Sequence, residues 1–156
     1  MITKHFKFEE FTFSEIAARN GLDNIPDNTI AARLQGVAER MEFIRDKLDA
    51  PIIITSGYRS PQVNKSVGGS IHSAHCEGWA ADFKSPTFGD PYTLALRVSG
   101  MGLIFDQIIH EYGQWVHISF DPRARLQLLT IFDGKTGYKT GIVTKDIYYS
   151  KENYTA

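Results

Sequence analysis

Apolar residues recur at alternating steps of four and three along one segment, which predicts the longest helix of the chain. The segment follows Pro26, Asp27 and Asn28, and charged residues fill the positions between the apolar ones. The apolar positions are Ile30, Leu34, Val37, Met41, Ile44 and Leu48. Because a helical turn has three to four residues, they form one face, which we expect to pack on a core rather than on a partner helix. Pro51 is expected to stop this helix.

Two shorter helices are predicted from their end residues. One runs from Ser14 as N-cap to a closing Gly21, and the other from Asp90 and Pro91 to Gly100. Ser and Asp side chains cap the first turn, Pro fits the first helical position, and Gly commonly ends a helix.

Strand patterns fill much of the remaining chain. Ile52 to Ile54 is a β-branched run that fits only a buried strand, and Ala80 to Phe83 is a second short strand. Two antiparallel pairs are expected around glycine-containing turns. Their strands are 103–111 with 115–120, and 125–132 with 138–143.

The N-terminal residues 1–29 alternate aromatic clusters with polar residues. We expect Phe6, Phe8, Phe11 and Phe13 to anchor this segment as it wraps the core, because aromatic side chains bury large apolar areas.

Composition indicates one domain over residues 1–156. The chain is 42% hydrophobic and carries a net charge of -1 with both signs scattered, so no surface for nucleic acid and no membrane-binding helix is expected. Cys76 is the only cysteine, which excludes an intramolecular disulfide. The N-terminus lacks an apolar signal segment, so we expect a protein that is made in the cytoplasm without a signal peptide and without membrane insertion. Nothing in the sequence demands more than a monomer, which is the expected oligomeric state.

Residues 56–78 are rich in Gly, Ser, Pro and Asn, which is typical of a long ordered loop. Loops of this length inside a compact domain are usually functional.

The candidate metal-binding side chains lie in this loop and in the strands that follow it. Alternation along 115–120 places His117 on the face opposite the core, and the same argument places Asp82 opposite its apolar neighbours. His75 precedes the strand of Asp82, and its glycine-rich loop lets the ring turn toward that carboxylate. Two His and one carboxylate are a recurring ligand set for a catalytic Zn²⁺, which keeps a fourth position for water or substrate.

A catalytic zinc of this kind also calls for a nearby carboxylate that takes up the proton of the bound water, and Glu111 is the best-placed candidate. A two-residue turn of Gly113 and Gln114 would put His110 on the face of His117, whereas a three-residue turn would put Glu111 there. The spacing leaves both turns open.

The motifs SGYRSPQVNKSVGGS from Ser56, then SxH, GxAADF and finally WVHIS, resemble those of the VanX/VanY-type zinc D-alanyl-D-alanine carboxypeptidases. The resemblance is strongest to short phage-encoded relatives that include endolysins, and hedgehog signalling domains share the fold. It implies His75, Asp82 and His117 as Zn²⁺ ligands. It also implies Arg59 as the cation that orients the substrate and stabilises the oxyanion.

The resemblance also bears on the base. Some members have an acid three residues before the last His, where this chain has Gln114, and others have it six before, where this chain has Glu111. We therefore assign Glu111, with His110, Asp106 or a metal site with little turnover as the remaining options. Two further residues of the loop are candidates for substrate contacts, with core packing and loop capping as their alternatives. They are Tyr58 and Ser73.

The expected fold is α+β, with a small antiparallel sheet, the long N-terminal helix on one face and a zinc cleft on the other. The expected function is zinc-dependent hydrolysis of D-Ala-containing stem peptides of peptidoglycan, as a carboxypeptidase or an endopeptidase. Action on the cell wall would follow release during phage lysis or delivery as a virion component. A zinc-binding assembly module, which Gln114 keeps open, and a zinc amidase are the alternatives.

Overall fold

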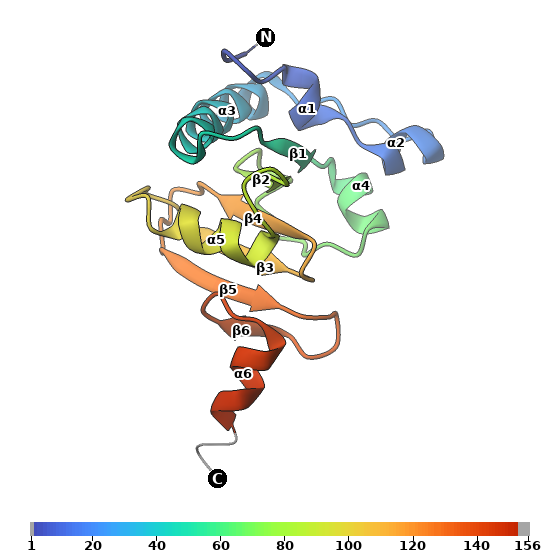
Figure 1. The fold of residues 1–156 in the computed structure, drawn as a ribbon. Coiled ribbons are helices and arrows are strands. Elements are labelled where there is room, and N and C mark those ends of the chain that lie inside the picture. Colours follow the sequence, from blue (N-terminus) through green and yellow to red (C-terminus); the bar gives the residue numbers. More distant parts are fainter. Residues whose placement is uncertain (1, 153–156) are drawn as a thin grey trace.

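The structure is a computed structural model that describes residues 2–152, so both ends of the predicted domain 1–156 lie outside the described residues. It contains one six-stranded sheet with helices packed around it (Figure 1). The strands are β1 Ile53–Ser56, β2 Ala80–Lys84, β3 Gln107–Glu111, β4 Trp115–Ser119, β5 Gln127–Ile131 and β6 Tyr138–Thr140. The helices are α1 Phe8–Thr12, α2 Glu15–Asn20, α3 Asn28–Leu48, α4 Pro61–Ser66, α5 Pro91–Ser99 and α6 Lys145–Glu152.

The strand order is β1-β2-β4-β3-β5-β6. The sheet is mixed rather than antiparallel, because β5 pairs with β3 in parallel while the other pairs are antiparallel. Ser119 at the end of β4 lies opposite Gln107, and Gln127 at the start of β5 lies on the other side of Gln107. The chain therefore crosses the start of β3 and enters β5 in the direction of β3.

One face of the sheet carries the hydrophobic core, which α3 and α5 cover. Its buried side chains come from the two helices and from alternate strand positions. They include Leu34, Val37, Met41 and Ile44 of α3, Leu94 and Val98 of α5, and Phe83, Ile108, Val116 and Ile118 of the sheet. Alternation leaves the opposite face free of these large apolar side chains, and that face carries Asp82 and His117.

The three predicted helices form close to their expected ends. The Asp27 side chain accepts a hydrogen bond from the Ile30 N–H at the start of α3, and Ser14 and Asp90 cap α2 and α5 in the same way. The end of α3 differs, because the helix stops at Leu48 with Asp49 in a left-handed conformation, before Pro51 is reached.

The N-terminal segment packs beside β1. Phe6 and Phe11 are buried and stack edge to face, but the prediction for Phe13 is wrong, because this side chain is 68% exposed. The backbone of α1 approaches the end of β1 very closely: a Cβ on Gly57 would lie 2.3 Å from the Phe11 carbonyl oxygen. Only glycine permits this contact.

Two local expectations need correction. The run from Ile52 forms β1 at an edge of the sheet, so Ile53 is 52% exposed and the strand is not buried. The predicted loop 56–78 contains the short helix α4, which Ser60 caps through a hydrogen bond from the Val63 N–H. The helix shortens the irregular part of the loop and leaves 67–79 as the segment that carries His75.

Candidate metal centre

Three side chains converge on one point of the sheet face opposite the core. The Nε2 of His75 lies 3.1 Å from Asp82 Oδ1 and 3.1 Å from His117 Nδ1, and His117 Nδ1 lies 2.9 Å from Asp82 Oδ1. All three residues are buried. The sequence prediction named these same residues, and the structure brings them together.

The sheet places two of the three. Asp82 on β2 lies directly opposite His117 on the neighbouring strand β4, and both side chains point to the same face. Ala80, two residues before Asp82, lies on that face as well, and its small side chain is buried.

His75 reaches the same point from the loop before β2. Its Nδ1–H donates a hydrogen bond of 2.6 Å to the Gly57 carbonyl, so the lone pair of Nε2 faces Asp82 and His117. The backbone N–H of His75 donates to the Ser73 hydroxyl, and that of Arg59 donates to the His75 carbonyl. The ring is therefore held from two sides of the loop.

The three groups shift one another's pKa. Burial alone would raise the pKa of Asp82, but the two imidazoles outweigh it and hold this pKa far below its usual range. Burial lowers the pKa of His75. For His117, burial acts in the same direction, but the hydrogen bond and charge of Asp82 outweigh it and raise the pKa. An ionised carboxylate between two imidazoles is the donor set expected of a divalent metal site.

The spacing of the donor atoms fits zinc. Bonds of about 2.0–2.1 Å in a tetrahedral arrangement separate neighbouring ligand atoms by roughly 3.3 Å, close to the 2.9–3.1 Å observed. The hydrogen bond from His75 to a backbone carbonyl is the usual outer contact of a metal-binding histidine.

Glu111 lies on the same face at the end of β3. Its Oε1 is 4.0 Å from His117 Nδ1, and its Oε2 accepts a hydrogen bond of 2.9 Å from Trp115 Nε1. Glu111 pairs with Trp115 across a turn of three residues in which Tyr112 and Gly113 have positive φ. Of the two turns that the sequence left open, the structure has the longer one.

Burial is the main reason that the pKa of Glu111 is raised, and the charge of Asp82 adds to it. The carboxyl group therefore holds a proton more readily than an exposed glutamate does, as a group that accepts and returns a proton requires.

The other candidate bases make contacts away from the three donor residues. His110 points to the core side, where its ring packs 5.9 Å from that of Tyr92 and its Nδ1–H donates to the Val143 carbonyl. The Asp106 carboxylate is 1% exposed and accepts hydrogen bonds from Arg125. Gln114 is exposed in the turn after Glu111. His110 and Asp106 are therefore not placed to accept a proton beside the three donor residues.

A cleft of about 570 Å³ lies over the metal centre. Arg59, Ser73, Glu111 and the three donor residues line it. Arg59 Nε is buried without a hydrogen-bond partner among the described residues. Tyr58, a predicted substrate contact, is absent from the lining: it is 6% exposed and belongs to the hydrophobic core, the alternative given for it above.

Sequence reasoning missed two residues that support the centre. Gly57, whose carbonyl orients His75, has no polar side chain and gave no signal. Trp115 lies two residues before His117 on β4 and so shares its face, but nothing in the sequence showed that its indole N–H would reach Glu111.

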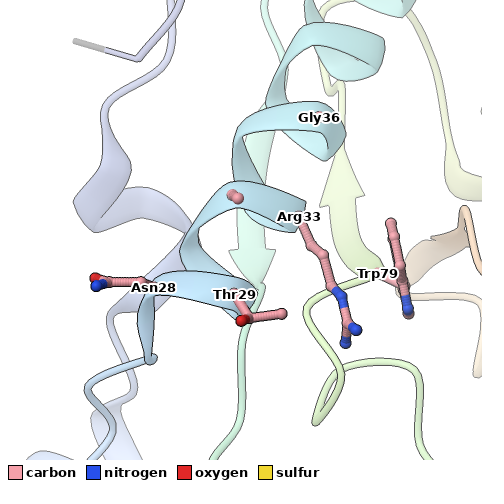
Figure 2. Close-up of a pocket in the computed structure, with 6 residues that line it drawn as sticks. Asn28, Thr29, Arg33, Gly36 and Trp79 are labelled. Atoms are coloured by element: carbon pink, nitrogen blue, oxygen red, sulfur yellow. The ribbon is translucent and has the colours of Figure 1, made fainter.

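A shallower hollow lies beside the N-terminal half of α3 (Figure 2). There the Arg33 guanidinium stacks over the Trp79 ring at 4.8 Å, and Arg33 also donates to the carbonyl and the carboxylate of Glu77. These contacts hold the chain between His75 and β2. The lining of the hollow contains no histidine, cysteine or carboxylate.

A second group of potential donors joins the N-terminal segment to α3. His5, Glu42 and Asp46 lie together, but His5 and Glu42 are only partly buried and Asp46 is exposed. The Glu42 carboxylate is already occupied by hydrogen bonds from Thr3 and from the backbone and ring of His5. These contacts fasten the N-terminal segment to the helix.

The family model described as peptidase M15 matches residues 4–119, which is most of the chain and includes every residue of the metal centre. The chain therefore belongs to the peptidase M15 family, and its class is that of a peptidase. No curated protein matches the chain. Within the described residues, no helix combines the length and apolar character needed to cross a membrane.

Proposed function

We propose that this protein is a zinc-dependent peptidase that hydrolyses D-Ala-containing stem peptides of bacterial peptidoglycan. One observation carries the proposal: a buried set of two imidazoles and one carboxylate shares a cleft with a glutamate of raised pKa, in a chain of the peptidase M15 family. His75, Asp82 and His117 would hold the ion. When bound, zinc supplies the Lewis acidity that activates water at neutral pH and polarises a carbonyl.

Glu111 is the proton-transfer group in this proposal. It lies 4.0 Å from His117, within reach of a water held beside the metal centre. Its carboxylate accepts the proton of the attacking water, and its raised pKa helps it to keep that proton until the amine leaves. The hydrogen bond from Trp115 fixes the carboxylate in the orientation that this transfer needs.

Arg59 is the substrate-orienting group. Its side chain lines the same cleft as Glu111 and His117, which supports a role beside the proposed reacting centre. A planar guanidinium binds a carboxylate or a developing oxyanion through paired hydrogen bonds. Ser73 contributes through the loop, because its hydroxyl accepts the hydrogen bond of the His75 backbone.

The proposed substrate class is peptides that contain D-Ala. It rests on the resemblance to carboxypeptidases and endolysins that act on D-Ala residues. Delivery to the wall during phage lysis or on a virion belongs to the same proposal.

Hydrolysis of synthetic peptides tests the proposal directly. The zinc-loaded protein should hydrolyse a terminal or an internal peptide bond in peptides that contain D-Ala-D-Ala, and peptides with L-Ala-L-Ala should stay intact. A chelator should abolish the reaction and added zinc should restore it. Cleavage that continues in the chelator would refute the zinc mechanism, and equal cleavage of both peptides would refute the substrate class.

A further inference from the structure

The connection between β4 and β5 has a strained backbone. Ala124 and Leu126 both adopt positive φ, at 46° and 55°, although neither is a glycine. Left-handed backbone is unfavourable for residues that carry a Cβ, and it persists only where the surroundings enforce it. Arg125 lies between the two and is therefore held in a defined direction.

The enforcing group is the buried carboxylate of Asp106. Its Oδ1 accepts hydrogen bonds from the backbone N–H and Nε of Arg125 at 3.0 and 2.8 Å, and its Oδ2 accepts one from Nη2 at 2.7 Å. Arg123 Nη2 lies 3.7 Å from the same carboxylate. Arg123 also donates to Asp121 through its backbone N–H, Nε and Nη2.

Stability alone does not account for this arrangement. A buried carboxylate paired with arginine contributes little to stability compared with apolar side chains of the same size, since desolvation offsets the attraction. What the arrangement does achieve is orientation. The Nη1 groups of Arg123 and Arg125 make no hydrogen bond to any residue that the structure describes, and the two side chains remain 52% and 36% exposed.

Both arginines line the cleft that contains the metal centre. On β3, Ile109 lies opposite His117, and Asp106 precedes it by three residues. At about 3.3 Å per residue, Asp106 is therefore roughly 10 Å along the sheet from the level of His117. An extended peptide covers that distance with about three residues.

We propose that Arg123 and Arg125 form a subsite that binds a carboxylate of the substrate peptide, about three residues from the bond that is cleaved. The proposal rests on the proposed peptidase function, because the distance is counted from its reacting centre. The oriented guanidinium edges suit a carboxylate, which accepts paired hydrogen bonds. Arg123 and Arg125 would thus determine specificity without touching the bond that reacts.

Peptide pairs that differ only in charge test the subsite. One pair carries Glu or Gln three residues before the scissile bond, and a second pair carries them three residues after it. The zinc-loaded wild type should show a kcat/KM about tenfold higher for the Glu peptide of one pair, as expected for a charge-assisted hydrogen bond. In Arg123→Gln and Arg125→Lys the ratio should fall below about threefold.

Arg19→Gln is the matched control, because it removes an exposed arginine of α2 that does not line the cleft. The wild-type ratio should persist in this variant. A ratio of one in the wild type, or a tenfold ratio that survives both cleft variants, would overturn the subsite.

Calorimetric binding of the same peptides to Glu111→Gln separates this inference from the proposed function. Preferential binding of the Glu peptide without cleavage by the wild type would support the subsite and refute the peptidase reaction. Cleavage without any preference, in binding or in kcat/KM, would support the reaction and refute the subsite.

Discussion

At the scale of single residues, the role of Glu111 depends on the turn that follows it. Because the turn has three residues, the Glu111 side chain shares a face with Trp115 and His117. A turn one residue shorter would have brought His110 to that face instead. The chemistry of the cleft thus depends on the left-handed conformation of Tyr112 and Gly113.

Glu111→Gln is the most informative single substitution. It keeps the shape of the side chain and its contact with Trp115 but removes the ability to accept a proton. We expect kcat to fall by about 10²–10⁴-fold, the usual contribution of a general base, with bound zinc unchanged. Peptide hydrolysis and metal analysis of the purified variant check this. Full activity in Glu111→Gln would exclude Glu111 as the base.

Loss of a donor residue is expected to weaken zinc binding, whereas loss of Glu111 is expected to remove proton transfer alone. Substituting His117→Ala deletes one of the three proposed ligands and leaves the Asp82 carboxylate buried beside a single imidazole. We expect zinc affinity to fall by at least 100-fold, measured by competition with a coloured chelator, and activity to fall with it. Wild-type affinity in this variant would show that the ion binds elsewhere.

Alternation was sufficient to predict that two of the three candidate donors share a face of the sheet. The alternation of β2 and β4 predicts that Asp82 and His117 share a face, and strand pairing brings them opposite each other. The length of the turn after Glu111 could not be predicted, because both lengths satisfy the local sequence. Tyr58 lies within the motif of the loop, but its burial depends on α1, which the sequence pattern did not indicate.

At the scale of elements, the N-terminal segment supports the metal centre from a distance. The Phe11 carbonyl accepts a hydrogen bond of 2.7 Å from the Tyr58 N–H, which fixes the chain next to Gly57. The Gly57 carbonyl in turn accepts the hydrogen bond that orients His75. The contact between α1 and β1 is therefore two hydrogen bonds away from a proposed metal-binding nitrogen.

Gly57→Ala tests this connection. The added Cβ would lie 2.3 Å from the Phe11 carbonyl oxygen, so the backbone must move and carry the Gly57 carbonyl with it. We expect zinc affinity to fall by about 10- to 100-fold, as on loss of an outer hydrogen bond to a ligand. Gly134→Ala is a control at a glycine with no neighbour within 4 Å and should leave zinc affinity unchanged. Equal affinities in all three proteins would contradict the connection.

The connection between β4 and β5 makes a prediction about pH. Hydrogen bonds from Arg125 hold the pKa of Asp106 below its ordinary value, so ionised Asp106 stabilises the folded state at pH values above about 4. That stabilisation is lost as the pH falls through the lower pKa of the folded state.

Asp106→Asn should therefore lower the free energy of unfolding by about 1–3 kcal/mol at pH 7. The difference from wild type should shrink below about pH 4. Urea unfolding of both proteins between pH 3 and 7 measures it. A difference that stays constant over this range would show that the charge of Asp106 does not contribute.

At the scale of the whole molecule, periodicity and capping residues predicted α2, α3 and α5, because local sequence determines where such helices begin. The order of the strands in the sheet could not be predicted from the sequence. The parallel pairing of β5 with β3 depends on where the chain goes after β4, and residues 120–126 show no pattern that distinguishes a crossing from a hairpin. Neither α1 nor α4 is long enough to show a helical repeat, so both were missed.

Metal binding should also stabilise the fold as a whole. The donor side chains are buried together, and an ion that binds only the folded state adds about 2.7 kcal/mol when present at 100 times its dissociation constant. For a domain of this size the melting temperature should rise by roughly 5–10 °C. Calorimetric melting with zinc and with a chelator measures the shift. An unchanged melting temperature would mean that the folded protein has no zinc site of useful affinity.

The central claim is that the metal centre hydrolyses peptides of the bacterial cell wall. Mass spectrometry of purified peptidoglycan fragments tests it most directly, with the zinc-loaded protein, a chelated sample and Glu111→Gln in parallel. We expect loss of a terminal alanine, or of cross-linked dimers, only in the zinc-loaded wild type, and the mass change would identify the bond. Identical fragments in all three samples, with zinc bound in the first, would contradict the claim.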